Sequence, residues 1–308
     1  AKGPAMLRPI SPALADNGTA LGRPDTTLRL IADSPGWQGE TLRPGLDFAS
    51  QDYLSLAAHP AIRAAASDPL PTSVALELNS RLAAFLQLPV VATFASGTDA
   101  IRQTLGTLLR PGDEVIVDTG AHPAMAETVL HAQAHLHRTP SGSAEGVERR
   151  LARLSRGPRH GRIVIAVPAV SAHGSRISDL AELTNLARHY DALLVVDVTH
   201  DLGAMGQTGS GVMEIQGCLG RADVVLGSFF PTFARSGGFA AFRNPAHLAA
   251  QSRPHPEASV NTDAVLAALD LVASPEGRRR RRNLHGLSLR LRNHLMSDGI
   301  KVMGQASP

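Results

Sequence analysis

The feature that most constrains the fold is an alternation that begins at Val90, in which short β-branched apolar runs are followed by longer segments with helical spacing. This alternation is typical of a mostly parallel sheet covered by helices. It predicts strands at 90–94, 114–118, 162–167, 192–197, 223–227 and 238–242. It predicts helices at 100–109, 124–134, 144–154 and 180–190.

The two ends of the chain differ from this middle part. The first 45 residues are rich in Pro, Gly, Asn and Asp, which favours an arm over a packed core. After Phe242 the pattern is helical, with helices expected at 264–273 and 275–296. We therefore expect three parts: an N-terminal arm over 1–45, a large domain over 46–245, and the start of an incomplete small C-terminal domain over 246–308.

Composition excludes several classes of protein. A chain of 308 residues that is 43% hydrophobic can bury a substantial core. The single cysteine, Cys218, cannot form an intramolecular disulfide, and no Cys/His cluster has metal-ligand spacing, so we expect a reducing compartment and no metal. No stretch of about 18 apolar residues and no leader pattern is present, so we expect no membrane span and a cytoplasmic location.

The charge pattern does not favour nucleic acid. A net charge of +3 over 308 residues gives a weak field, and no basic stripe is interleaved with aromatic residues. The run Arg278 to Arg282 could bind phosphate groups. We prefer the interpretation that it belongs to the solvated face of an amphipathic helix, because leucines recur through residues 284–295.

Candidate functional residues follow the predicted strands, because open parallel sheets bind ligands beyond the carboxyl ends of their strands. Small residues over 95–100 lead directly into a helix, whose free N–H groups and dipole suit a phosphate. His122 follows the second strand, and Asp197 ends a buried strand, where a carboxylate needs a cationic partner. The segment GSFFPTFARSGG, residues 227–238, is the fourth candidate.

In order and spacing, these segments resemble the α-oxoamine synthase family of enzymes that use pyridoxal phosphate (PLP). This family includes 8-amino-7-oxononanoate synthase, serine palmitoyltransferase, aminolevulinate synthase and 2-amino-3-ketobutyrate ligase. The matching segments are FASQDYLSLAAHPAIRAAA, FASGTDA, DTGAH, VVDVTHDLGAMGQTGSG and ADVVLGSF, followed by a double glycine. The resemblance implies a three-layer α/β fold of type I, like that of aspartate aminotransferase, and an acyltransferase activity.

The resemblance also implies roles for single positions around the cofactor phosphate. Ser96, Gly97 and Thr98 match the loop that holds the phosphate. Ser228 matches a hydroxyl near it.

Four further positions match residues that contact the cofactor ring. His122 matches a histidine that stacks on the pyridine ring, and Asp197 matches the carboxylate that pairs with the ring nitrogen. His200 and Ser171 match groups that contact the ring hydroxyl.

One departure from the family pattern is central. The family reads G-[ST]-x-S-K, then five residues, then Gly-Gly, and the ungapped register puts Pro231 at the lysine position. That lysine links the family's enzymes to the cofactor and then moves a proton, and proline has no amine for either task. The chain contains only two lysines, Lys2 and Lys301, and the guanidinium of Arg235 is too basic to replace an amine.

Other positions depart from the family as well. The acidic residue that commonly follows the ring aspartate is Val198 here, and His173 stands where the family has an acidic residue in a turn. The loop expected before Ala75 is shortened to 67–73. Several changes at once favour relaxed catalytic constraint over one compensated replacement.

These observations leave three hypotheses. The first is an α-oxoamine synthase-like protein that does not catalyse the condensation alone and serves as a non-catalytic or regulatory subunit, as a homodimer or beside a lysine-bearing relative. The second is an acyltransferase- or aminotransferase-like enzyme that takes an acyl thioester or amino acid and either holds PLP, or its amine form, without a covalent bond or uses the acyl-thioester site for an altered transfer chemistry. The third is a structural or regulatory module whose pocket residues persist for packing alone.

Overall fold

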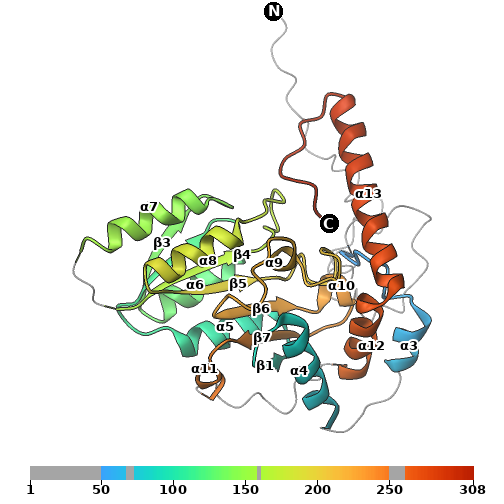
Figure 1. The fold of residues 1–308 in the computed structure, drawn as a ribbon, viewed down its shortest axis with the longest axis horizontal. Helices are drawn as coiled ribbons and strands as arrows, with labels where there is room; N and C mark the ends of the chain where they lie inside the picture. The colour runs from blue at the N-terminus through green and yellow to red at the C-terminus, as the bar shows by residue number, and fades with distance from the viewer. Residues whose placement is uncertain (1–49, 67–72, 158–160, 250–260) are drawn as a thin grey trace, which may run out of the picture. The chain divides into compact units, whose positions relative to one another are not determined.

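The computed structural model describes residues 50–66, 73–157, 161–249 and 261–308. Its described strands form one sheet, in the order β1-β7-β6-β5-β4-β2-β3 (Figure 1). Every neighbouring pair is parallel except those of β7, which runs antiparallel to β1 and β6. The strands are β1 (Val90–Phe94), β2 (Glu114–Asp118), β3 (His135–Thr139), β4 (Ile163–Pro168), β5 (Ala192–Asp197), β6 (Val224–Ser228) and β7 (Gly238–Phe242).

Helices occupy most of the connections between these strands. They are α3 (Pro60–Ala65), α4 (Ser73–Leu86), α5 (Gly97–Leu108), α6 (Pro123–His131), α7 (Ala144–Leu154), α8 (Leu180–His189), α9 (Val212–Ile215), α10 (Phe230–Phe233), α11 (Pro245–Ala249), α12 (Thr262–Ala273) and α13 (Pro275–Ser297). The mostly parallel sheet with flanking helices confirms the predicted fold class.

The sheet is buried on both faces, which gives two separate cores. Along β4, Val164 and Ala166 face the cluster that includes apolar residues of α5 and α6. Ile163 and Ile165 face the opposite cluster, to which α4, α7, α8 and α12 contribute. Since a strand buried on both faces cannot alternate apolar with polar residues, β4 reads as the continuous run Ile-Val-Ile-Ala-Val. The result is three layers, with helices on each side of the sheet.

The structure contains elements that the sequence pattern did not predict. Strand β3 reads His-Leu-His-Arg-Thr and lacks an apolar run because it lies at the sheet edge, where His135 and Arg138 are exposed. Within the candidate segment 227–238, for which no helix was predicted, the four-residue helix α10 is present. Helix α4 also went unpredicted. The predicted arm, 1–45, lies outside the described residues, and the predicted boundary at 245 stays a prediction.

Candidate functional site

Glycines allow the start of α5 to lie close to the end of β6 and the start of β7. Phe94, the last residue of β1, is paired with Gly238, and Gly238 is also paired with Ser228 at the end of β6. A Cβ atom on Gly97 would lie 2.7 Å from the Cβ of Ser228, and one on Gly238 would lie 2.5 Å from the carbonyl oxygen of Ser96. No side chain fits at Gly97 or Gly238 because of these close approaches. The predicted phosphate loop, residues 96–98, therefore packs directly beside Ser228.

The N-terminus of α5 is capped by Ser96. The Oγ atom of Ser96 accepts a hydrogen bond from the backbone N–H of Asp99 at 3.0 Å and donates one to the Asp99 carboxylate at 2.7 Å. The first-turn N–H groups of Gly97 and Thr98 have no carbonyl partner within a helix, and the helix dipole makes this end positive. This end can hold a phosphate, although Asp99 already places one negative charge in the first turn.

Asp197, the last residue of β5, is a buried carboxylate with 7% of its surface exposed. Its Oδ1 atom accepts hydrogen bonds from the backbone N–H of Thr199 at 2.9 Å and from the Thr199 hydroxyl at 2.6 Å. The same hydroxyl oxygen accepts a hydrogen bond from the backbone N–H of Ser228 at 3.2 Å. Thr199 therefore connects the predicted ring carboxylate to the predicted phosphate hydroxyl. Sequence reasoning did not give it a role, although an Asp-x-Thr sequence is typical of a turn closed by the aspartate.

His200 lies beside Asp197 and contacts Tyr53. The phenol oxygen of Tyr53 is 2.9 Å from Nδ1 of His200. Burial lowers the pKa of His200, the charges of His122 and His173 lower it further, and the charge of Asp197 opposes them. Burial raises the pKa of Tyr53 to about 12. Both side chains are therefore largely uncharged at neutral pH.

His122 and Ser171 lie in neighbouring loops after β2 and β4. The Nδ1 atom of His122 accepts a hydrogen bond from the backbone N–H of Ala124 at 3.2 Å, so this exposed histidine caps α6. The hydroxyl of Ser171 donates to the carbonyl of His173 and accepts from the backbone N–H of Arg176, each at 3.0 Å. Ser171 therefore has one oxygen lone pair left, and its donor is already used inside its own loop.

Pro231 is buried in the short helix α10. Its carbonyl oxygen accepts a hydrogen bond from the backbone N–H of Tyr53 at 3.4 Å. On either side of it, Phe229 and Phe233 pack edge to face, with ring centroids 5.8 Å apart. The guanidinium of Arg235 donates to the carbonyls of Ala234 and Ile62. The segment thus presents an apolar, tightly packed turn with no amine.

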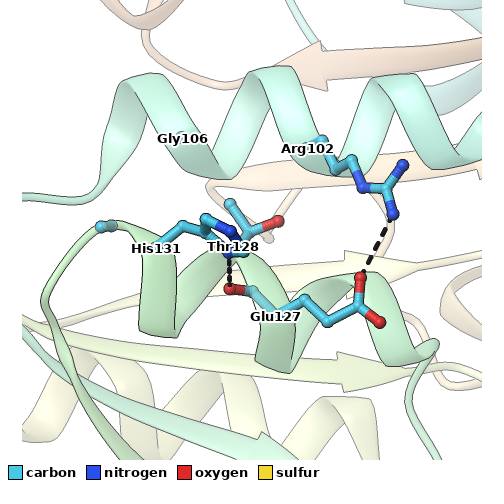
Figure 2. Close-up of a pocket in the computed structure, with 6 residues that line it drawn as sticks. Arg102, Gly106, Glu127, Thr128 and His131 are labelled. Atoms are coloured by element: carbon cyan, nitrogen blue, oxygen red, sulfur yellow. Dashed lines mark hydrogen bonds and ion pairs between the residues drawn. The ribbon is translucent and has the colours of Figure 1, made fainter.

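A separate cleft of about 490 Å³ lies between α5 and α6. Figure 2 shows Arg102 of α5 pointing to Glu127 of α6, and their side chains form an ion pair at 3.2 Å. The imidazole of His131 bonds to the backbone carbonyl of Glu127 at 2.8 Å. None of the residues predicted to form the site lines this cleft.

Metal-binding clusters and membrane-spanning helices are both absent from the described part of the chain. Among residues 50–66, 73–157, 161–249 and 261–308, no three His, Cys, Asp or Glu side chains are grouped so that they could hold a metal ion. Within the same ranges, no helix combines the length and the apolar character needed to cross a membrane.

Comparison with known proteins identifies the family. The family model for aminotransferase class I and II matches residues 45–308. The chain belongs to the aminotransferase class I and II family. It is 30% identical over 281 residues to an 8-amino-7-oxononanoate synthase of Citrifermentans bemidjiense, covering 84% of this chain and 71% of that protein. It is 29% identical over 282 residues to a 2-amino-3-ketobutyrate coenzyme A ligase of Escherichia coli, covering 84% and 70%.

Solved structures agree on the fold. A Sphingomonas wittichii serine palmitoyltransferase superposes with a TM-score of 0.72 at 21% identity, covering 80% of this chain and 66% of that one. The 8-amino-7-oxononanoate synthase of Francisella tularensis gives a TM-score of 0.72 at 17% identity, covering 85% and 79%. This aminotransferase-family chain therefore has the type I fold of PLP-dependent transferases, and PLP is the cofactor of the family.

Proposed function

We propose that this α-oxoamine synthase-like chain holds PLP without a covalent bond and does not condense an acyl thioester with an amino acid by itself. The observation that carries the proposal is Pro231, which stands at the lysine position of an ungapped segment between Gly227 and Gly238. Among the described residues, Lys301 is the one lysine, and its side chain is exposed.

The residues present fit the chemistry of the cofactor. Asp197 is buried, yet none of the ion pairs of the described residues includes it. Because a buried carboxylate is costly without a cation, a protonated pyridine nitrogen would supply the partner that Asp197 needs. When bound, PLP supplies an electron sink for negative charge that develops on the substrate.

Other residues would make the remaining contacts to the cofactor. The N-terminus of α5, with Ser96, Gly97 and Thr98, would hold the phosphate together with the Ser228 hydroxyl. The ring hydroxyl would meet His200 on one side and the free lone pair of Ser171 on the other. His122 would then cover the ring face.

The residues proposed to hold PLP include no base that could move a proton at the reacting carbon of a substrate. A proline nitrogen in a peptide bond carries no proton and no free electron pair for transfer. The Arg235 guanidinium stays protonated and makes hydrogen bonds to backbone carbonyls. We therefore propose that the chain acts as a non-catalytic subunit, either paired with itself or with a lysine-bearing relative.

Titration with PLP tests the binding. We expect purified protein to bind PLP reversibly, with a change in cofactor absorbance and with no adduct on the polypeptide after borohydride reduction. An Asp197→Asn variant should bind PLP at least tenfold more weakly, whereas the exposed-site control Asp298→Asn should bind like the wild type. A reducible covalent adduct on the wild-type chain, or no binding of PLP, contradicts the proposal.

Two further measurements address the catalytic role. Acyl-CoA and a panel of amino acids should give no product with the chain alone. A Pro231→Lys variant should gain the reducible adduct, because it restores an amine to the segment. Product formation by the wild-type chain alone would instead support the second candidate, an enzyme with non-covalent PLP, which the retained contacts of Asp197 and His200 favour.

A further inference from the structure

The contact between Tyr53 and His200 joins segments that lie far apart in the chain, and the proposed function does not explain it. Tyr53 precedes α3, whereas His200 follows β5. Their ring centroids are 6.4 Å apart, and the phenol oxygen lies 2.9 Å from Nδ1 of the imidazole. No hydrogen bond from the other ring nitrogen, Nε2, to a described residue accompanies this contact.

The direction of this hydrogen bond follows from acid–base chemistry. A phenol is a stronger acid than a neutral imidazole N–H, and an imidazole nitrogen is a stronger base than a phenol oxygen. Tyr53 therefore donates and Nδ1 of His200 accepts. Because a neutral imidazole carries one N–H, the proton must then be on Nε2.

The backbone around Tyr53 is fixed on several sides. The Asp52 carboxylate accepts hydrogen bonds from the backbone N–H groups of Leu56 at 2.7 Å and Ala57 at 2.9 Å. Leu56 is fully buried, and the guanidinium of Arg280 donates to the carbonyl of Leu54 at 2.8 Å. The Tyr53 N–H donates to the Pro231 carbonyl. The phenol is thus held in place before any ligand arrives, which reduces the entropy cost of positioning His200.

We propose that Tyr53 is a positioning residue that fixes His200 as the Nε2–H tautomer, so that His200 presents a donor to an oxygen acceptor such as the ring hydroxyl oxygen of PLP. This inference rests on the proposed function for the identity of that acceptor. The tautomer itself can be measured without any cofactor.

Other charged groups act on the same imidazole. Asp197 at the end of β5 favours the protonated form, whereas His122 at the start of α6 and His173 in the loop after β4 disfavour it. The Tyr53 hydrogen bond also favours the neutral form, because it uses the lone pair that a second proton would need. Loss of the phenol hydroxyl should therefore raise the pKa of His200 toward the ordinary histidine value.

Nitrogen NMR of ¹⁵N-histidine-labelled protein without cofactor tests the proposal, with His200→Gln used to assign the signals. We expect the wild type to show the Nε2–H tautomer at His200. In Tyr53→Phe, which keeps the ring and the backbone hydrogen bond, we expect a mixture of tautomers and a higher His200 pKa. Tyr190→Phe is the matched control, because Tyr190 packs on His189, and it should leave His200 unchanged.

Different results would contradict the role of Tyr53 and the proposed binding of PLP. An Nδ1–H tautomer in the wild type, or an unchanged His200 signal in Tyr53→Phe, overturns the role of Tyr53. PLP affinity of Tyr53→Phe should fall several-fold, and an affinity equal to that of Tyr190→Phe also overturns the role. If wild-type protein binds no PLP, the proposed function fails, while the cofactor-free spectra still decide which tautomer Tyr53 imposes.

Discussion

The contact between Gly97 and Ser228 gives a sharp test of how the site is built. In Gly97→Ala, the new Cβ atom would lie 2.7 Å from the Cβ and 3.3 Å from the Cα of Ser228. Carbon atoms pack best at about 3.5–4.0 Å, so α5 and β6 must separate by roughly 0.8 Å or more. Both elements are anchored in the core, so this movement strains the sheet.

The size of the effect follows from two opposing contributions. Overpacking typically costs about 1–3 kcal/mol, whereas alanine gains up to about 1 kcal/mol over glycine in a helix. We therefore expect Gly97→Ala to lower the free energy of unfolding by about 1–2 kcal/mol. The control is Gly106→Ala in the same helix, whose new Cβ would meet its nearest atom, Cγ2 of Thr128, at an ordinary 3.9 Å. It should be neutral or stabilising.

Urea unfolding of both variants measures these differences, provided that the denaturant slope stays constant. A double variant, Gly97→Ala with Ser228→Gly, removes the opposing Cβ atom. It should recover more stability than the two single changes predict together, with a coupling energy of about 1 kcal/mol or more. If Gly97→Ala is as stable as Gly106→Ala, the close approach of the phosphate loop to β6 is refuted.

Three further predictions concern stability. Burial raises the pKa of Asp201 from 3.8 to about 8 in the folded chain, so the folded state keeps a proton that the unfolded state loses. The free energy of unfolding should therefore fall as the pH rises from about 4 to about 8. Urea titrations at several pH values should show this fall for the wild type and a flatter dependence for Asp201→Asn. The interpretation of the run Arg278 to Arg282 as a solvated face is wrong at Arg281, which is buried and donates hydrogen bonds to the carbonyls of residues 203, 206, 207 and 272. Arg281→Ala should therefore lower the free energy of unfolding, measured in urea, by about 3–5 kcal/mol, whereas exposed Arg282→Ala should change it by no more than about 0.5 kcal/mol. Equal effects would contradict the buried role of Arg281. Ser96→Ala removes the α5 cap and should cost about 1 kcal/mol in thermal unfolding, and an unchanged midpoint would refute the cap.

Much of the fold could be predicted because its strands are buried on both faces. The run at β4 is apolar throughout and that at β5 is apolar up to its last residue, Asp197, so the bounds of both strands differ from the predicted ones by one residue at most. The edge strand β3 has no such signal, since His135 and His137 are satisfied there by hydrogen bonds to Glu114. Helix α10 has only four residues, fewer than the periodicity argument requires.

The candidate site was predictable where residues follow strands and unpredictable where distant segments meet. Ser96, Asp197 and Ser228 lie at strand ends, and the rule for open sheets finds them. The partnership of Tyr53 with His200 spans 147 positions in the sequence, so no local pattern contains it. Thr199 acts through hydrogen bonds to two strands, which become evident only when the register of β5 and β6 is known.

The place of β7 in the sheet sets an order of assembly during synthesis. Strand β1 is paired only with β7 among the described strands, and the partner of Val90 is Phe242. A nascent chain must therefore be synthesised almost to residue 242 before β1 can pair with β7. Until then the backbone of β1 is unpaired and can pair incorrectly with other strands. Ribosome-bound chains that stop before β7 should accordingly be captured by chaperones, whereas chains a few dozen residues longer should escape them.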